Sequence, residues 1–165
     1  MVKENRLDNL HLTFDNRLNG IKFKGPLGSV VKLFGGKDLV LFDKKIFFFS
    51  KSSLRTFDNM LTTVSKGLVS GFFVKLNLVG LGFRFLKIEN YILLKLGYGH
   101  YTKIMIPKGL HIFGYKRQLF LFGVDFNQVR AFSESLRLQR FPDAYKGKGI
   151  QYHMENLIFK EGKQK

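Results

Sequence analysis

Two lysines alternate with two glycines close to the carboxyl end of the chain. In residues 145–150, Lys146 and Lys148 are each followed by a glycine, Gly147 and Gly149 respectively. Ammonium groups bind phosphate oxygens, and glycines let a polyanion come close to the backbone and its N–H groups. The ring of Tyr145 adds a surface that packs on a sugar or a base. The spacing therefore predicts a phosphate-binding segment.

Further cations lie on both sides of this segment. Arg137 and Arg140 precede it, and Lys160, Lys163 and Lys165 follow it. Together they would prolong a basic track along a nucleic acid. A flexible basic tail is the alternative interpretation for the last two lysines.

A glycine-rich turn supplies two secondary candidates, Tyr98 and His100. An exposed histidine or tyrosine ring contacts phosphate or stacks on a base. Ordinary surface or packing residues are the alternative interpretation. The remaining histidines have no metal-ligand spacing, and no paired acidic motif accompanies them.

The known motifs for nucleotide chemistry are incomplete. Residues 80–85 begin like a dinucleotide-binding fingerprint but lack its third glycine. No Gly-Lys pair has the spacing of a phosphate-binding loop, and with no cysteine there is no thiol nucleophile or thiolate ligand. We therefore expect no catalytic residue, no metal, no cofactor and no small-molecule substrate.

The overall charge points to a polyanionic partner. The 165 residues include 28 Lys and Arg against 12 Asp and Glu, a formal charge of +16. This positive charge is spread along the whole chain, which is typical of a protein embedded in nucleic acid. Two alternatives are also compatible with it: binding to an anionic membrane surface, and a basic surface that only keeps the protein soluble. No apolar run approaches the roughly 20 residues that span a bilayer, so we expect no transmembrane segment.

The elements that position these residues follow a repeated theme. Alternating residues over 11–50 predict a small antiparallel meander. Apolar residues then recur three and four positions apart over 53–71, which predicts a helix. Its stripe comprises Leu54, Phe57, Leu61, Val64 and Leu68. Gly67, inside this helix, costs about 1 kcal/mol relative to alanine, so it is tolerated rather than helpful unless another backbone packs closely there.

The second half repeats the order of strands followed by a helix. Strands are expected between residues 73 and 122, and a helix begins near Asp125 with Val129, Phe132 and Leu136 on one face. Residues 141–150 have no helical stripe and are expected to be extended. The predicted class is α+β, with two similar small units, each an antiparallel sheet packed against one helix: residues 1–72, and residues 73–165 with the basic C-terminal segment.

Several short motifs resemble the bacterial and organellar form of large ribosomal subunit protein six, the L-six family. The resemblance covers nearly the whole chain. The motifs that carry it are Tyr145-Lys146-Gly147-Lys148-Gly149-Ile150, Leu78-Val79-Gly80-Leu81-Gly82-Phe83-Arg84, Leu96-Gly97-Tyr98-Gly99-His100, Ile106-Pro107-Lys108-Gly109-Leu110, Gly123-Val124-Asp125, Lys24-Gly25-Pro26-Leu27-Gly28 and Lys66-Gly67 with Gly71-Phe72.

The resemblance implies a structural protein of the large subunit with no catalytic role. Its expected partners are large-subunit rRNA, bound mostly by the C-terminal unit near the sarcin-ricin loop and the factor-binding side, and neighbouring large-subunit ribosomal proteins. It implies rRNA contacts for residues 145–149 and, secondarily, for residues 97–100. A free-standing basic module that binds nucleic acid or a membrane surface outside the ribosome is the alternative.

The composition also bears on the compartment. Abundant Phe and Lys without Trp or Cys resembles proteins encoded by AT-rich organelle genomes. Charged residues interrupt the N-terminal region where a signal peptide would be apolar. We expect a mitochondrial ribosome in the matrix, with the protein encoded in the organelle, ahead of a plastid or a bacterial cytoplasm.

Overall fold

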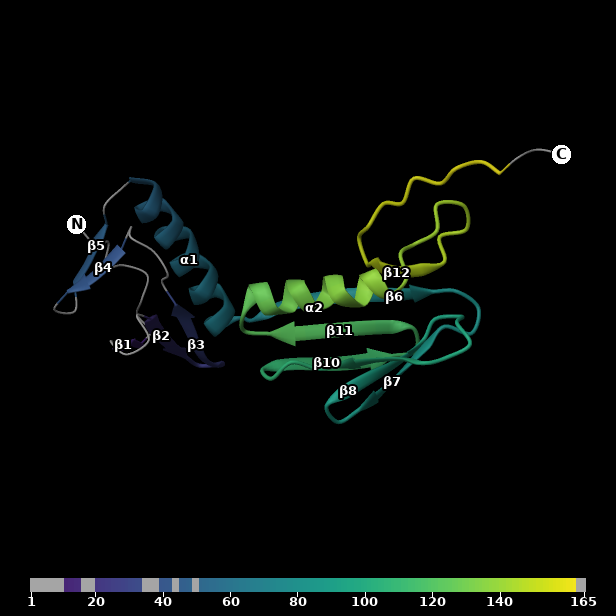
Figure 1. Ribbon diagram of the computed structural model, residues 1–165, viewed down its shortest axis with the longest axis horizontal. Coiled ribbons are helices and arrows are strands. Elements are labelled where there is room, and N and C mark those ends of the chain that lie inside the picture. Colours follow the sequence, from purple (N-terminus) through teal and green to yellow (C-terminus); the bar gives the residue numbers. More distant parts are fainter. Residues whose placement is uncertain (1–10, 16–19, 34–38, 43–44, 49–50, 163–165) are drawn as a thin grey trace. The chain divides into compact units, whose positions relative to one another are not determined.

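The computed structural model describes residues 11–15, 20–33, 39–42, 45–48 and 51–162, and it has the predicted α+β class (Figure 1). The chain divides into two compact units, residues 1–72 with 124–126, and residues 73–123 with 127–165. The elements of the first half are β1 (His11–Asp15), β2 (Gly20–Gly25), β3 (Gly28–Leu33), β4 (Leu39–Phe42), β5 (Lys45–Phe48) and α1 (Lys51–Val69).

The first unit packs its helix on a small antiparallel sheet. Strands β1, β2 and β3 pair in that order, and β4 pairs with β5 as a separate hairpin. Val64 and Leu68 of α1 are buried in one cluster with Ile21 and Phe23 of β2. Phe57 and Leu61 pack against that cluster, which confirms the predicted stripe from Phe57 onward. Leu54, in the first turn, is exposed, so the stripe does not extend to the start of α1.

Gly67 lies where the helix meets another backbone segment of the same unit. A Cβ at this position would overlap the carbonyl oxygen of Val124 and come within 2.8 Å of the Phe72 ring. The expected condition for tolerating glycine inside the helix is therefore met, because only glycine allows this approach.

The second unit contains two sheets and one helix. Its elements are β6 (Phe72–Val79), β7 (Arg84–Ile88), β8 (Tyr91–Lys95), β9 (Thr102–Met105), β10 (Leu110–Tyr115), β11 (Gln118–Gly123), α2 (Phe126–Gln139) and β12 (Gly149–Tyr152). One sheet has the order β10-β11-β6-β12, and the other has the order β7-β8-β9. Helix α2 runs along one face of the four-stranded sheet (Figure 1).

The sheet and α2 are joined by alternating apolar side chains. Leu76 and Leu78 of β6 are fully buried, as are Leu119 and Leu121 of β11. On α2 the buried apolar residues are Val129, Phe132 and Leu136, as the helical spacing predicted. Period-two burial on the strands and a stripe on the helix therefore form one core layer.

The segment after α2 differs from the extended conformation that we predicted. Residues 144–146 form a turn, and only from Gly149 does the chain become a strand. That strand, β12, pairs antiparallel with β6 and places Ile150 opposite Leu78. The physical reason is local, because Asp143 closes a turn that sequence alternation alone does not reveal.

Neither a membrane-spanning helix nor a cluster of metal ligands occurs in the ranges that the structure describes. Among those residues, no helix is long and apolar enough to cross a membrane. In the same ranges, no group of three or more His, Asp or Glu side chains is arranged to hold a metal ion.

Candidate nucleic-acid interface

Asp143 organises the turn that carries the two lysines, residues 143–148, which we call the lysine turn. Its carboxylate accepts the backbone N–H of Tyr145 at 3.3 Å and that of Lys146 at 3.2 Å. Its carbonyl accepts the N–H of Gly147 at 2.8 Å, and its own N–H donates to the carbonyl of Lys148 at 3.0 Å. Four hydrogen bonds to one residue therefore define the shape of the turn.

The cationic and aromatic side chains of the turn face solvent. Lys146 and Lys148 are exposed, and the side chain of Tyr145 is 59% exposed. Ile150, two residues after the turn, is fully buried in the sheet. The lysine turn therefore directly precedes β12, a strand whose second residue lies in the core.

The two glycines pack against other parts of the protein's own chain. Gly147 and Gly149 are buried, and a Cβ on Gly149 would lie 2.5 Å from the carbonyl oxygen of Phe141. A Cβ on Gly147, which has a φ of +64°, would lie 3.0 Å from the ring of Phe159. The close approach at these glycines is therefore made by the protein's own chain, and their contact with a polyanion stays a prediction.

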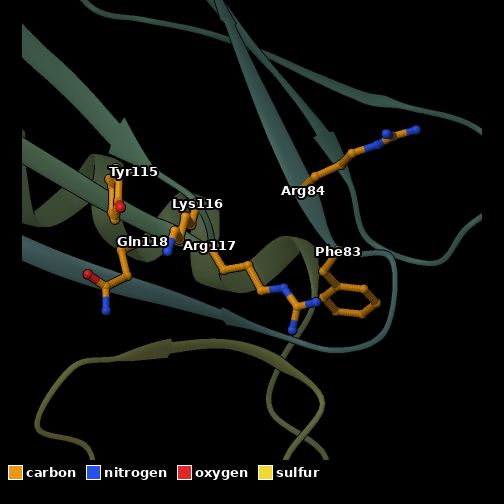
Figure 2. A pocket seen from close by; sticks show the side chains of 6 residues that line it. All are labelled: Phe83, Arg84, Tyr115, Lys116, Arg117 and Gln118. Atoms are coloured by element: carbon orange, nitrogen blue, oxygen red, sulfur yellow. The ribbon is translucent and has the colours of Figure 1, made fainter.

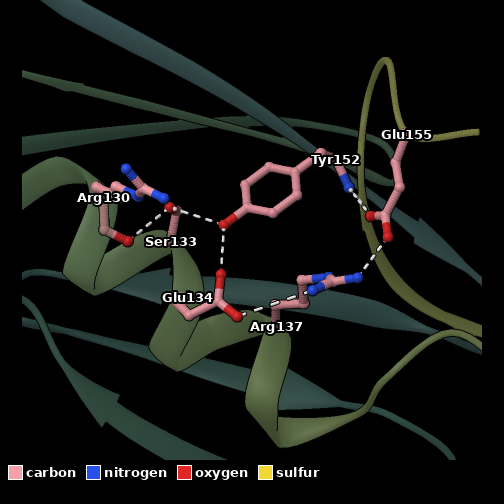
Figure 3. A network of polar contacts seen from close by, with 6 residues as sticks. All are labelled: Arg130, Ser133, Glu134, Arg137, Tyr152 and Glu155. Carbon is pink, nitrogen blue, oxygen red and sulfur yellow. Dashed lines mark hydrogen bonds and ion pairs between the residues drawn. The ribbon is translucent and has the colours of Figure 1, made fainter.

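Arg137 is held by carboxylates of its own unit (Figure 3). Its guanidinium forms a short ion pair with Glu155 and a second ion pair, at 3.7 Å, with Glu134. It also lies over the rings of Phe141 and Tyr152, at 5.2 and 5.6 Å from their centroids. This arrangement ties α2 to the chain on both sides of β12.

Tyr152 joins the same network. Its hydroxyl donates to Glu134 Oε2 at 2.8 Å and lies 3.2 Å from Ser133 Oγ, while its backbone N–H donates to Glu155 Oε2 at 3.1 Å (Figure 3). Burial raises the pKa of the Tyr152 phenol above its ordinary value of 10.0, and the hydrogen bond from the neutral phenol to Glu134 acts in the same direction. The neutral hydroxyl is thus the form that the folded protein favours.

Arg140 connects the predicted basic track to the turn that contains Tyr98. Its guanidinium donates to the carbonyl of Leu96 and lies over two rings, Phe83 at 5.2 Å and Tyr98 at 4.8 Å. The Tyr98 hydroxyl donates to the carbonyl of Gln139 at 3.3 Å, and the His100 ring stacks on Tyr98 at 5.9 Å. Tyr98 and His100 are both exposed, so their outer surfaces remain accessible.

A residue of the C-terminal segment, Lys160, contacts the lysine turn. The N–H of Lys160 donates to the carbonyl of Ala144 at 2.9 Å, and the Lys160 side chain is exposed. Lys163 and Lys165, which we also predicted as contacts, lie outside the described residues.

Sequence reasoning missed the acidic residues that organise this region. Asp143 follows a proline and is the first residue of the lysine turn, a recognised turn signal that could have identified it. Glu134 lies three positions before Arg137 on α2, a spacing at which helical side chains form ion pairs, so its pairing could be read from the sequence. Glu155 carries no comparable signal, because Arg137 meets it only after the chain has passed through the turn and β12.

Comparison with known proteins gives a consistent set of relatives. The large ribosomal subunit protein uL6m of Prototheca wickerhamii is 37% identical, and that match covers 60% of this chain and 57% of the relative, little more than half of its length. The uL6 protein of Thermodesulfovibrio yellowstonii is 32% identical over 94% of this chain and 91% of its own. The uL6m protein of Dictyostelium discoideum is 29% identical over 90% and 88%.

No protein-family model matches the chain. The similarity to the Thermodesulfovibrio protein nevertheless extends over almost the full length of both chains. The three relatives are named as large ribosomal subunit proteins uL6 or uL6m. The chain therefore belongs to the uL6 family of large ribosomal subunit proteins.

Proposed function

We propose that this protein is a structural constituent of the large ribosomal subunit that binds large-subunit rRNA through its C-terminal unit. By the family resemblance, the binding region lies near the sarcin-ricin loop and the factor-binding side. The proposal extends to neighbouring large-subunit proteins as partners and to a mitochondrial ribosome, ahead of a plastid or bacterial one. Relatives named uL6m support the organellar placement.

The observation that carries this proposal is the construction of the lysine turn. Lys146, Lys148 and Tyr145 are exposed, while the residues between and after them are buried against the protein's own chain. Two ammonium groups and one ring are thereby held on a turn of defined shape. Such a surface combines phosphate binding with recognition of folded RNA by shape.

The other cations divide between two roles in this proposal. Lys160 and the outer surfaces of Tyr98 and His100 extend the contact surface, because their side chains are exposed. Arg137 and Arg140 position that surface, because their guanidinium groups are already bonded to Glu155 and to the Leu96 carbonyl. Lys163 and Lys165 stay predicted contacts.

Salt dependence of RNA binding tests the proposal. Each phosphate contact contributes about 0.7 to 0.9 to the slope of log affinity against log salt, so Lys146→Ala with Lys148→Ala should reduce the slope by about 1.5. The control is Arg55→Ala with Lys66→Ala, two exposed cations of α1. Filter binding to an in vitro transcript of large-subunit rRNA measures the slope. A double variant with the wild-type slope would count against the lysine turn as a contact.

Sedimentation separates this function from the alternative outside the ribosome. In a sucrose gradient of a cell or organelle extract, the protein should migrate with the large subunit and dissociate at high salt. Recovery only in the light fractions, or with lipid, would favour a free-standing basic module instead.

A further inference from the structure

A second basic surface lies at the tip of the β10–β11 hairpin, beside the start of β7. Here the second unit forms a cleft of about 650 Å³. We call it the hairpin cleft, and it is lined by Phe83, Arg84, Tyr115, Lys116, Arg117 and Gln118 (Figure 2). Its volume falls within the range of about 300 to 1,000 Å³ that is usual for clefts that bind small ligands.

The cleft is cationic and unneutralised. Arg84, Lys116 and Arg117 are exposed, and no acidic side chain lines the cleft. Within the described part of the chain, none of the three forms an ion pair with a carboxylate. Arg117 reaches toward Phe83, whereas Arg84 extends outward on the far side of the cleft (Figure 2). The cations thus lie on two sides of one opening and repel one another until an anion binds.

The backbone at the hairpin tip is in a conformation that lysine rarely adopts. Tyr115 pairs with Gln118, so Lys116 and Arg117 form a two-residue turn, and Lys116 has a φ of +53°. Glycine or asparagine is the favoured residue in this left-handed conformation. The two-residue hairpin turn requires this conformation, and it holds the Lys116 side chain at the tip of the hairpin.

The cleft also has a fixed apolar floor and an exposed ring at its rim. Phe83 is only 5% exposed; Gly80 packs against its ring, where a Cβ would lie at 2.8 Å, and Arg140 lies over it at 5.2 Å. Tyr115, at the rim, is 63% exposed. A ribose or a base packs on an exposed ring such as that of Tyr115, while guanidinium groups bind the adjoining phosphates.

We propose that the hairpin cleft binds the sugar-phosphate backbone of a second RNA segment, separate from the one at the lysine turn. This inference rests on the proposed rRNA-binding function and deepens it: one unit joins two RNA segments. An acidic protein segment would neutralise the cations of the cleft. A nucleotide would in addition pack its sugar or base on the exposed ring and on the planar guanidinium groups.

The first test removes the charge while keeping the fold. The variant combines Arg84→Gln, Lys116→Asn and Arg117→Gln, in which asparagine suits the left-handed position better than lysine does. For binding to the large-subunit rRNA transcript, the slope of log affinity against log salt should decrease by about 2, as expected for the loss of three phosphate contacts. The control changes Arg55, Lys66 and Arg130, three exposed cations outside the cleft, to glutamine. The thermal melting of each variant reports whether it is folded.

The second test locates the RNA. Because the chain has no cysteine, Lys116→Cys and Tyr145→Cys each give one attachment point for an iron chelate that cleaves nearby RNA. The two probes should cut different nucleotides of the bound transcript. No cleavage from position 116, or an unchanged salt slope in the folded cleft variant, overturns the inference.

The outcomes also distinguish this inference from the function on which it rests. If the wild-type chain does not bind the transcript, the proposed function itself fails. If the wild type binds and the lysine turn variant loses slope while the cleft variant does not, only the second RNA site fails. A folded cleft variant that keeps its slope but no longer holds a neighbouring protein in the particle would assign the cleft to an acidic protein segment instead.

Discussion

Removal of the Asp143 carboxylate tests whether RNA affinity depends on the conformation of the lysine turn or only on the positive charge of the protein. Asp143→Ala removes the acceptor of the Tyr145 and Lys146 N–H groups, at 3.3 and 3.2 Å, and also raises the net charge by one. If charge alone drives binding, this variant binds RNA more tightly. If the shape of the lysine turn matters, it binds more weakly. The two explanations therefore predict opposite signs.

The magnitude follows from the two hydrogen bonds. They are exposed and fairly long, so we assign each about 0.5 to 1 kcal/mol, the lower part of the usual range. A loss of about 1 to 2 kcal/mol of turn stability corresponds to a roughly 5- to 30-fold weaker complex, if RNA binds only the formed turn. The backbone bonds of Asp143 to Gly147 and Lys148 remain possible in the variant.

Two matched variants complete the experiment, with affinity for the rRNA transcript measured at constant salt. Asp143→Asn removes the charge and keeps one side-chain oxygen, so it can accept only one of the two N–H groups that the two carboxylate oxygens accept. Glu161→Gln removes an exposed carboxylate in the C-terminal segment. Glu161→Gln should bind as well as the wild type or slightly better, and Asp143→Asn should bind with an affinity between those of Asp143→Ala and Glu161→Gln. If Asp143→Ala binds as tightly as Glu161→Gln, the reasoning that the turn is preorganised for RNA is refuted.

Two further predictions concern stability and are checked by chemical denaturation. Gly67→Ala should lower the unfolding free energy by about 1 to 3 kcal/mol despite the better helix propensity of alanine, because its Cβ overlaps the Val124 carbonyl; a stabilised variant would contradict this packing. Tyr152→Phe should cost about 1 to 2 kcal/mol near neutral pH, where its hydroxyl bonds to Glu134. Burial raises the pKa of Tyr152 above 10.0. The difference in unfolding free energy between the wild type and Tyr152→Phe should therefore persist below pH 10 and shrink as the pH rises through the folded-state pKa of Tyr152. A difference that stays constant through the folded-state pKa would argue against the network.

The secondary structure of this protein was largely predictable because its signals are local. Val129, Phe132 and Leu136 show the three-and-four spacing of one helix face, and that face is buried in the structure. The same spacing placed Val64 and Leu68 correctly. It failed for Leu54, which is exposed in the first turn of α1, because the periodicity of a helix does not tell how far along the helix its packing partners extend.

The partners of the basic residues were not predictable in the same way. Sequence reasoning placed Arg137 on a track for RNA, but the fold brings Glu155 to it and leaves the guanidinium bonded within the protein. Arg140 likewise meets the carbonyl of Leu96, 44 positions earlier. The sequence gives the sign of each charged side chain, but only the folded structure determines whether that side chain bonds within the protein or is exposed to a ligand.

By itself, the sequence determined the α+β class, the strongly basic character and the membership of the uL6 family, because composition, periodicity and short motifs are properties of adjacent residues. The tertiary structure alone decided that Gly147 and Gly149 accommodate the protein's own chain, that Asp143 shapes the lysine turn, and that Arg84 and Arg117 share one cleft. These are contacts between residues that the chain must fold to bring together, and burial and hydrogen bonding act only once they have met.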